Sequence, residues 1–180
     1  MYSKEWNAPQ YLECNTAARA RYMSDSERKV VYILNLARKN PQLFCETVVK
    51  PLAYDKTSSY YLSLVETMSK MEPLGILYPD SGCYASAHCH AYSTGITGYT
   101  GHERQTAECR KVQRYNGECC DYGTDKPLDI ILELLTDEDV PSLGHRQICL
   151  GDRYTGIGTS IQPHKQYSHV AVIDVVITRK

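Results

Sequence analysis

The last strand-like stretch of the chain constrains its fold more than any other feature. Residues 170–177 read VAVIDVVI, an apolar run interrupted only by Asp174. A strand with one face in water alternates apolar and polar residues, whereas a continuous apolar run is typical of a strand buried on both faces. We therefore predict a central strand over His169–Ile177, preceded by a strand over Tyr154–Gln162 and covered by other elements on both sides.

Helical patterns fill much of the chain before this strand pair. Ser24 and Glu27 form a capping box at the start of the first helix, and Asn40-Pro41 ends it. Apolar spacing predicts further helices, which cover Pro41–Val49, Tyr61–Met71, Asp80–Gly95, Pro127–Leu135 and a short stretch after Gly144. Helices followed by a doubly covered strand favour a mixed α/β (α+β) domain, a three-layer α-β-α sandwich over residues 24–180. Residues 1–23 lack periodicity and are predicted to be an N-terminal arm or tail.

Charge and hydropathy exclude two classes of protein. The formal net charge is −1 and the basic residues are dispersed, which argues against a nucleic-acid-binding protein. No apolar stretch approaches the length of a membrane span. The first ten residues, MYSKEWNAPQ, lack the apolar core of a signal peptide, so we expect either a cytosolic protein or a mature form without its leader.

Cysteine use is unusual for a chain of this size. There are eight cysteines, at positions 14, 45, 83, 89, 109, 119, 120 and 149. An even number fits a disulfide framework, but buried packing as small apolar residues explains the same pattern, and we keep both readings open. No C-x-x-C pair occurs, which disfavours a tetrathiolate zinc site. For the adjacent Cys119 and Cys120, packing ranks first, a disulfide to another cysteine second, and metal ligation third.

Two of the six histidines stand in similar glycine-preceded settings. His102 lies in GYTGHERQ and His145 in LGHRQ, with Glu118 between them in the segment NGE. Two imidazoles and a carboxylate from separate segments form a donor set that suits a divalent cation such as zinc. The same three groups suit acid–base chemistry near neutral pH.

Five segments stand out in order along the chain: LNLARKNP at 34–41, AHCH at 87–90, NGECCDYG at 116–123, LLTDEDVPSLGHR at 134–146 and YTGIG at 154–158. In this order they resemble the CAP superfamily (the sperm-coating, antigen-five and pathogenesis-related domain), in particular its bacterial branch. The resemblance extends from about residue 24 to residue 178. One departure is that Cys119-Cys120 stand where the family usually has Asn-Ile.

The resemblance implies a central antiparallel sheet and a cleft lined by a His/Glu tetrad that binds zinc or another divalent ion. It makes His102, Glu118 and His145 the metal-binding residues. The fourth member is an acid before Gly-His, for which Glu133, Asp137 and Asp139 are the candidates, with Asp137 favoured. The remaining residues that we expect to line the cleft are Asp137, Arg146, Glu103 and His90.

Other polar residues receive structural interpretations. We expect Arg146 to pair with Asp137 or Asp139, and Glu103 with Arg104 to form a solvated pair or the rim of the cleft. His88 and His90 are predicted to be buried hydrogen-bonding groups. His164 and His169 are predicted to face solvent.

The resulting functional hypothesis is an extracellular, periplasmic or cell-surface CAP-type domain. Its cleft would bind a divalent cation, a small ligand, a lipid or a peptide, without committed catalysis. The alternative is a metal-dependent hydrolase or peptidase in which Glu118 orients or deprotonates a water molecule.

Overall fold

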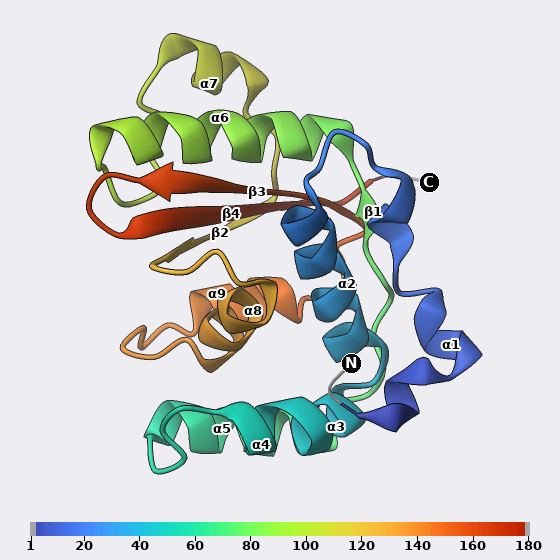
Figure 1. The fold of residues 1–180 in the computed structure, drawn as a ribbon. Coiled ribbons are helices and arrows are strands. Elements are labelled where there is room, and N and C mark those ends of the chain that lie inside the picture. Colours follow the sequence, from blue (N-terminus) through green and yellow to red (C-terminus); the bar gives the residue numbers. More distant parts are fainter. Residues whose placement is uncertain (1–2, 179–180) are drawn as a thin grey trace.

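A four-stranded sheet lies between two layers of helices in the computed structural model, which describes residues 3–178 (Figure 1). The elements in chain order are η1 Lys4–Asn7, α1 Pro9–Leu12, η2 Thr16–Arg19, α2 Asp25–Lys39, α3 Pro41–Phe44, η3 Cys45–Val49, α4 Lys50–Leu52, α5 Ser59–Lys70, β1 Tyr78–Pro79, α6 Ser81–Thr97, α7 Ala107–Val112, β2 Gly117–Tyr122, α8 Pro127–Thr136, α9 Gly144–Cys149, β3 Gly156–His164 and β4 Ser168–Val176. Helices α6 and α7 lie on one side of the sheet, and α2, α8 and α9 lie on the other. The predicted three-layer sandwich is confirmed.

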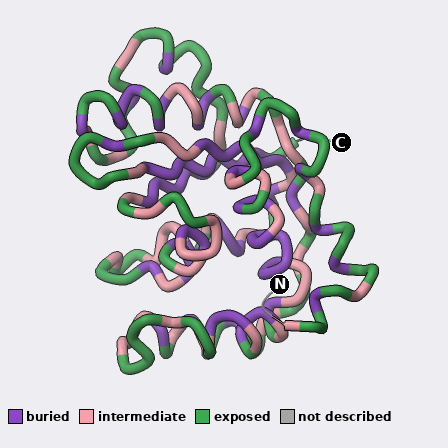
Figure 2. Tube along the Cα trace, viewed as in Figure 1, coloured by how far each residue is buried: buried purple, intermediate pink, exposed green. Residues whose placement is uncertain are grey.

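Strand β4 is central, as its apolar sequence predicts. The strand order is β1-β3-β4-β2, and β4 pairs antiparallel with both β3 and β2. Its Val170 and Val172 pack against α6, whereas Ala171, Ile173 and Val175 belong to the larger core on the other face. In Figure 2 strands β3 and β4 form a mostly buried band, coloured purple. The two-residue β1 pairs parallel with β3, so the sheet is mixed, although its three long strands are antiparallel as predicted.

Helix α6 lies directly on the backbone of the sheet because two glycines remove the intervening side chains. A Cβ atom at Gly158 of β3 would lie 2.0 Å from the backbone nitrogen of Tyr84, and one at Gly95 would lie 2.2 Å from the carbonyl oxygen of Pro163. Gly158 pairs with Asp174, which pairs with Glu118, so these three residues form one row across the sheet. This row therefore lies close beneath α6.

The N-terminal segment predicted as an arm or tail contributes to the main core. Trp6 is fully buried, lies 4.7 Å from the Tyr11 ring and 6.1 Å from the Phe44 ring, and donates a hydrogen bond to Thr47. These contacts attach residues 3–23 to α3 and η3. Among the described residues, none of the helices has the length and apolar character needed to cross a lipid bilayer.

Three local features differ from the sequence predictions. Strand β1 and helix α7 are not among the elements predicted from the sequence. The prediction that His164 faces solvent is wrong: the residue is only 4% exposed. Strand β3 continues to His164, whose ring packs against Tyr122 and Tyr167 and whose Nε2 lies 3.1 Å from the carbonyl oxygen of Tyr99. His169 is half-buried.

Candidate metal centre

His102 and Glu118 form the first half of the site. His102 follows α6 in a loop, and its Nδ1 lies 2.9 Å from Oε1 of Glu118, a buried residue of the edge strand β2. A carboxylate only accepts hydrogen bonds, so Nδ1 carries the proton and Nε2 of the neutral ring keeps its lone pair. The Glu118 hydrogen bond raises the pKa of His102. Burial alone would raise the pKa of Glu118, but hydrogen bonds from His102 and Arg104 hold it at about 2.

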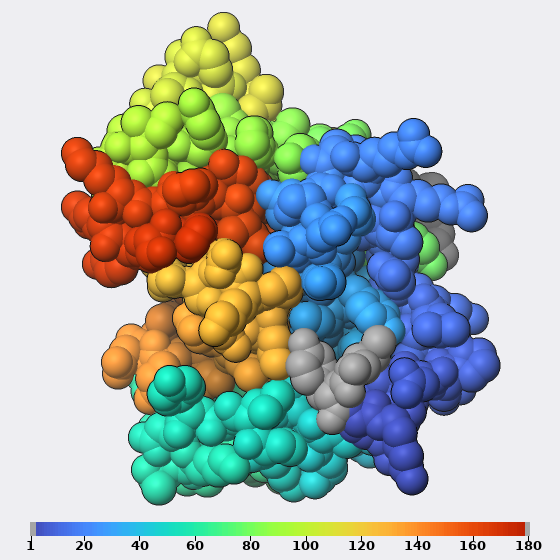
Figure 3. All heavy atoms as spheres, viewed as in Figure 1, coloured from blue at the N-terminus to red at the C-terminus, as the bar shows by residue number. Residues whose placement is uncertain are grey.

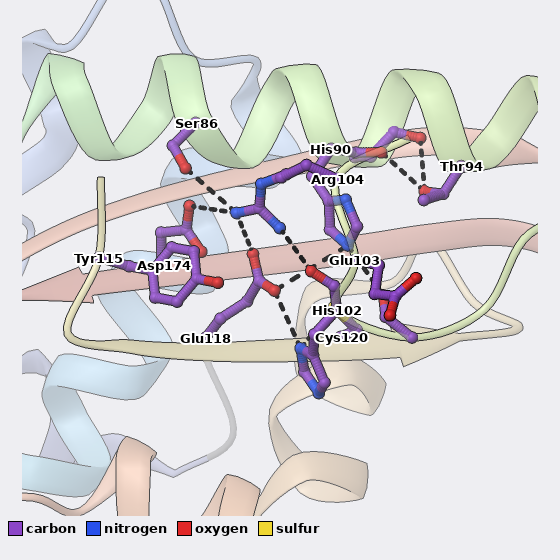
Figure 4. Close-up of polar contacts among 12 residues, drawn as sticks. Ser86, His90, Thr94, His102, Glu103, Arg104, Tyr115, Glu118, Cys120 and Asp174 are labelled. Carbon is purple, nitrogen blue, oxygen red and sulfur yellow. Dashed lines mark hydrogen bonds and ion pairs between the residues drawn. The ribbon is translucent and has the colours of Figure 1, made fainter. Parts of the chain in front are cut away.

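Arg104 holds Glu118 from the side of α6, which corrects the prediction of a solvated or rim residue. Its side chain is buried, and Nη2 donates to Oε2 of Glu118 at 2.5 Å and to the hydroxyl of Ser86 at 3.2 Å (Figure 4). The Arg104 guanidinium also lies 4.9 Å from the Tyr115 ring centroid. Arg104 therefore fixes Glu118, while Glu103 is exposed, as predicted for a rim position.

A second acid, Asp174, lies beside this pair and is fully buried. Its Oδ2 is 3.6 Å from Nη2 of Arg104, and its carboxyl group lies within hydrogen-bonding reach of the side chains of Ser86 and Glu118. Burial, together with the negative charge of Glu118, raises the pKa of Asp174 well above its ordinary value. A protonated Asp174 leaves one cation, Arg104, with one anion, Glu118, so the buried cluster is close to neutral.

His145 and Asp137 form the second half of the site. His145 is in the first turn of α9, and its Nδ1 lies 2.7 Å from Oδ1 of Asp137. The other oxygen of Asp137 accepts hydrogen bonds from the backbone N–H groups of His145 and Arg146. Asp137 ends α8 in the left-handed conformation with φ 56°, and this turn directs its side chain to the start of α9. Of the three acids considered from the sequence, Asp137 is therefore the one that contacts His145.

The two imidazole rings face each other across the edge of the sheet. Their centroids are 6.5 Å apart, and the rings are inclined by 42°. Each Nδ1 is held by a separate carboxylate, and within residues 3–178 neither Nε2 has a hydrogen-bond partner. The His102 side chain is 55% exposed, so solvent reaches this ring. Metal-binding histidines usually have their second nitrogen held by a carboxylate in this way.

A buried group next to this pair could also hold a metal ion. Ligand atoms of His90, Glu118 and Cys120 all lie within 4.8 Å of one another. Nε2 of His90 is 2.8 Å from the carbonyl oxygen of Gly101, and burial lowers the pKa of this histidine. Burial, followed by the charge of Glu118, raises the pKa of the Cys120 thiol well above its ordinary value. His90 is buried, as predicted for a hydrogen-bonding group.

Arg146 does not form the predicted ion pair. Its guanidinium donates to the carbonyl oxygens of Leu135, Thr136 and Tyr60 and to the hydroxyl of Ser63. Only its backbone N–H contacts Asp137. The side chain therefore joins α5, α8 and α9 and does not line the cleft beside His145.

Two of the cysteines form a disulfide and the others are buried side chains, so each of the two interpretations left open by the sequence applies to some of them. Cys89 and Cys109 form a disulfide that joins α6 to α7. The other six cysteines are free and buried, including Cys119 and Cys120, for which packing was the favoured interpretation. Within the described part of the chain, the thiols thus serve mainly as buried side chains.

His102, Glu118, His145 and Asp137 are candidates from the sequence, whereas the groups that surround Glu118, namely Arg104 and Asp174, are not. The sequence predicts Arg104 only as part of a solvated pair or of the cleft rim, and no pattern in the sequence marks Asp174 as its buried neighbour. The chain was compared with protein-family models, with curated proteins and with solved structures, and no match was found in any of the three comparisons.

Proposed function

We propose that this protein is a CAP-type binding domain that holds a divalent cation, zinc, between His102 and His145. The observation that carries the proposal is the pair of facing imidazoles whose Nδ1 atoms are each held by a different buried carboxylate, Glu118 and Asp137. Neutral imidazole is a preferred zinc ligand, and two histidines leave further coordination positions for water or a ligand.

The His102–His145 pair is a better candidate for the ion than the buried group of His90, Glu118 and Cys120. Both oxygens of Glu118 already accept hydrogen bonds, one from His102 and one from the positive Arg104. A cation placed beside Arg104 would be repelled, and the protonated Cys120 thiol would first have to lose its proton. An ion bound by the Nε2 atoms of His102 and His145 would not have to displace Arg104 or remove the proton of Cys120.

We propose binding without catalysis because of the state of Glu118. A hydrolase of the kind considered from the sequence needs a free carboxylate to orient or deprotonate water. Here the hydrogen bonds of Glu118 hold its pKa at about 2, which makes it a weak base. Its contacts suit a residue that orients His102.

Location outside the cytoplasm, at the cell surface or in the periplasm, is part of the proposal. The Cys89–Cys109 disulfide supports it, since disulfides persist mainly in oxidising compartments. The CAP assignment is supported by the order of the five sequence segments and by the convergence of GHE, NGE and LGHR on one edge of the sheet.

The experiment is a calorimetric titration of the protein with zinc. We expect one zinc per chain for the wild type and a loss of binding in His102→Ala, His145→Ala and the double variant. His169→Ala is the matched control, because His169 is a half-buried histidine outside the site. Cys120→Ser tests the buried group and should bind zinc as the wild type does. Undiminished zinc binding by a folded double variant would refute the proposal.

A further inference from the structure

A cavity of about 680 Å³ lies between α8, β2 and the loop that follows α4. This volume is within the range of small-molecule sites. Its apolar wall includes Tyr61, Tyr122, Leu128 and Leu132. Leu52, the last residue of α4, and Tyr54 of the following loop also line it and are themselves exposed. Figure 3 shows two of the contributing segments next to each other, α8 in orange and the region of α4 and α5 in teal.

The charged residues around this cavity are strongly unbalanced. Six acidic residues line it, with no lysine or arginine: Asp55, Asp121, Asp129, Glu133, Asp137 and Glu138. Four of the six have a hydrogen-bond or ion-pair partner of their own. Asp137 accepts a hydrogen bond from His145, and Glu138 accepts one from Ser58. Asp55 accepts a hydrogen bond from Thr57, and Asp129 lies 3.9 Å from Lys126. The remaining two, Asp121 and Glu133, have no basic or hydroxyl partner among the described residues and share a hydrogen bond with each other.

Asp121 is the informative member of this pair. It is only 8% exposed, and its Oδ2 is buried without a hydrogen-bond partner among the described residues. Asp121 belongs to β2, and Glu133 reaches it from α8. Burial, and then the charge of Glu133, raise the pKa of Asp121 to about 8. A buried carboxyl oxygen without a partner is costly, so a group that donates hydrogen bonds and carries positive charge would relieve the site.

We infer that this cavity binds an organic cation with an apolar body, a primary amine whose ammonium group lies between Asp121 and Glu133. The ammonium group takes the place of the proton that the two carboxyl groups share and donates hydrogen bonds to both, while the alkyl or aromatic part packs against Leu128, Leu132 and the tyrosine rings.

A metal ion is a poorer occupant of this position. Hard cations require several oxygen ligands, and among the described residues no third His, Cys, Asp or Glu side chain joins Asp121 and Glu133 closely enough to complete such a set. A fatty acid is also disfavoured, because the acidic side chains of the lining would repel its carboxylate. The apolar wall and the acidic pair together select for an amine.

This inference goes beyond the proposed metal centre and does not depend on it. Along β2, Glu118 and Cys120 face α6, whereas Asp121 faces the opposite layer, where Glu133 lies. The two sites share the lining residues Asp137 and His145, and Cys120, which also lines the cavity, lies 3.7 Å from Nδ1 of His102. Changes at Asp121 should therefore leave zinc binding intact, and His102→Ala should leave amine binding intact.

The test uses three probes of equal length, octylamine, octan-1-ol and octanoate, titrated into the whole protein by calorimetry and ligand-observed NMR. We expect octylamine to bind at least about tenfold more tightly than octan-1-ol, as a charge-assisted hydrogen bond provides, and octanoate not to bind. Equal binding of octylamine and octan-1-ol, or no binding of octylamine, would overturn the inference. This comparison needs no variant.

Two variants then locate the ammonium group. Asp121→Asn should weaken octylamine binding about tenfold or more and leave octan-1-ol binding unchanged, and Glu133→Gln, on the exposed side of the pair, serves as the second variant if Asp121→Asn does not fold. The matched control is Asp125→Asn, an exposed residue outside the cavity. Wild-type octylamine affinity in folded Asp121→Asn and Glu133→Gln would place the amine elsewhere and refute the assignment.

Discussion

Replacing Asp137 by Asn should weaken zinc binding at the candidate metal centre while the chain stays folded. Asp137 accepts three hydrogen bonds, two from backbone N–H groups at the start of α9 and one from Nδ1 of His145. Asn tolerates the left-handed backbone that this position requires. Its single amide oxygen still accepts from the backbone, but its NH₂ group then faces Nδ1 of His145. Two donors cannot share one hydrogen bond, so His145 must move its proton to Nε2, the atom that we propose as the metal ligand.

The expected effects follow from these contacts. The backbone bonds survive with a neutral acceptor in place of a charged one, and the negative charge at the start of α9 is lost. Together these changes should lower the free energy of unfolding by about 1 to 2 kcal/mol, or Tm by roughly 3 to 6 °C for a chain of this size. Zinc affinity should fall by about 10- to 100-fold, because an orienting carboxylate has been removed from a metal-binding histidine.

The assay pairs urea denaturation with zinc calorimetry on the same samples. Asp139→Asn is the control: Asp139 also has a left-handed backbone, with φ 59°, but its side chain is exposed. It should change stability by less than about 0.5 kcal/mol and leave zinc binding unchanged. If folded Asp137→Asn binds zinc as tightly as the wild type, the proposed role of the Asp137–His145 contact is wrong. The same conclusion follows if Asp139→Asn loses as much affinity.

Further predictions concern the buried cluster and the thiols. Arg104→Met should cost about 3 to 5 kcal/mol in urea denaturation, because it leaves the Glu118 carboxylate buried without its cation, and adding Glu118→Gln should recover most of the loss. The pKa of Glu118 is lowered from its ordinary 4.5 to about 2, so its contribution is present above pH 4.5 and disappears as the pH falls toward 2. Wild-type stability should therefore drop by roughly 3 kcal/mol more than that of Glu118→Gln over this range, and parallel pH curves would contradict this assignment. The pKa of Asp174 is raised, so the stability that its carboxyl group contributes is present at low pH and is lost as the pH rises. Asp174→Asn should therefore not reduce thermal stability at pH 7. Alkylation of the unfolded protein without reductant should modify six of the eight cysteines, as measured by mass spectrometry, since Cys89 and Cys109 are joined; eight modified thiols would exclude the disulfide.

The sequence predicts the parts of this fold that depend on local pattern. The apolar run VAVIDVVI identifies the central strand, and Ser24 with Glu27 identifies the start of α2, because both signals come from neighbouring residues. Strand β1 and the burial of His164 depend on contacts with distant segments, which leave no periodic signal.

The candidate site divides in the same way. Its histidines and Glu118 are marked by glycine-flanked motifs, whereas the roles of Arg104 and Asp174 arise only when the loop after α6 folds over the sheet. Asp137 is partly predictable: its position before Gly-His makes it a candidate in the sequence. Only the turn at the end of α8, which the structure shows, distinguishes it from Asp139.

The close contact between α6 and the sheet has a consequence for the charge state of the site. Gly158, Asp174 and Glu118 form one row, and the absence of a side chain at Gly158 lets α6 rest on this row. A methyl group there would lift the helix and admit water. Hydration would allow Asp174 to ionise and would weaken the attraction between Arg104 and Glu118. A glycine without any ionisable atom thus determines which protonation states the neighbouring carboxyl groups adopt.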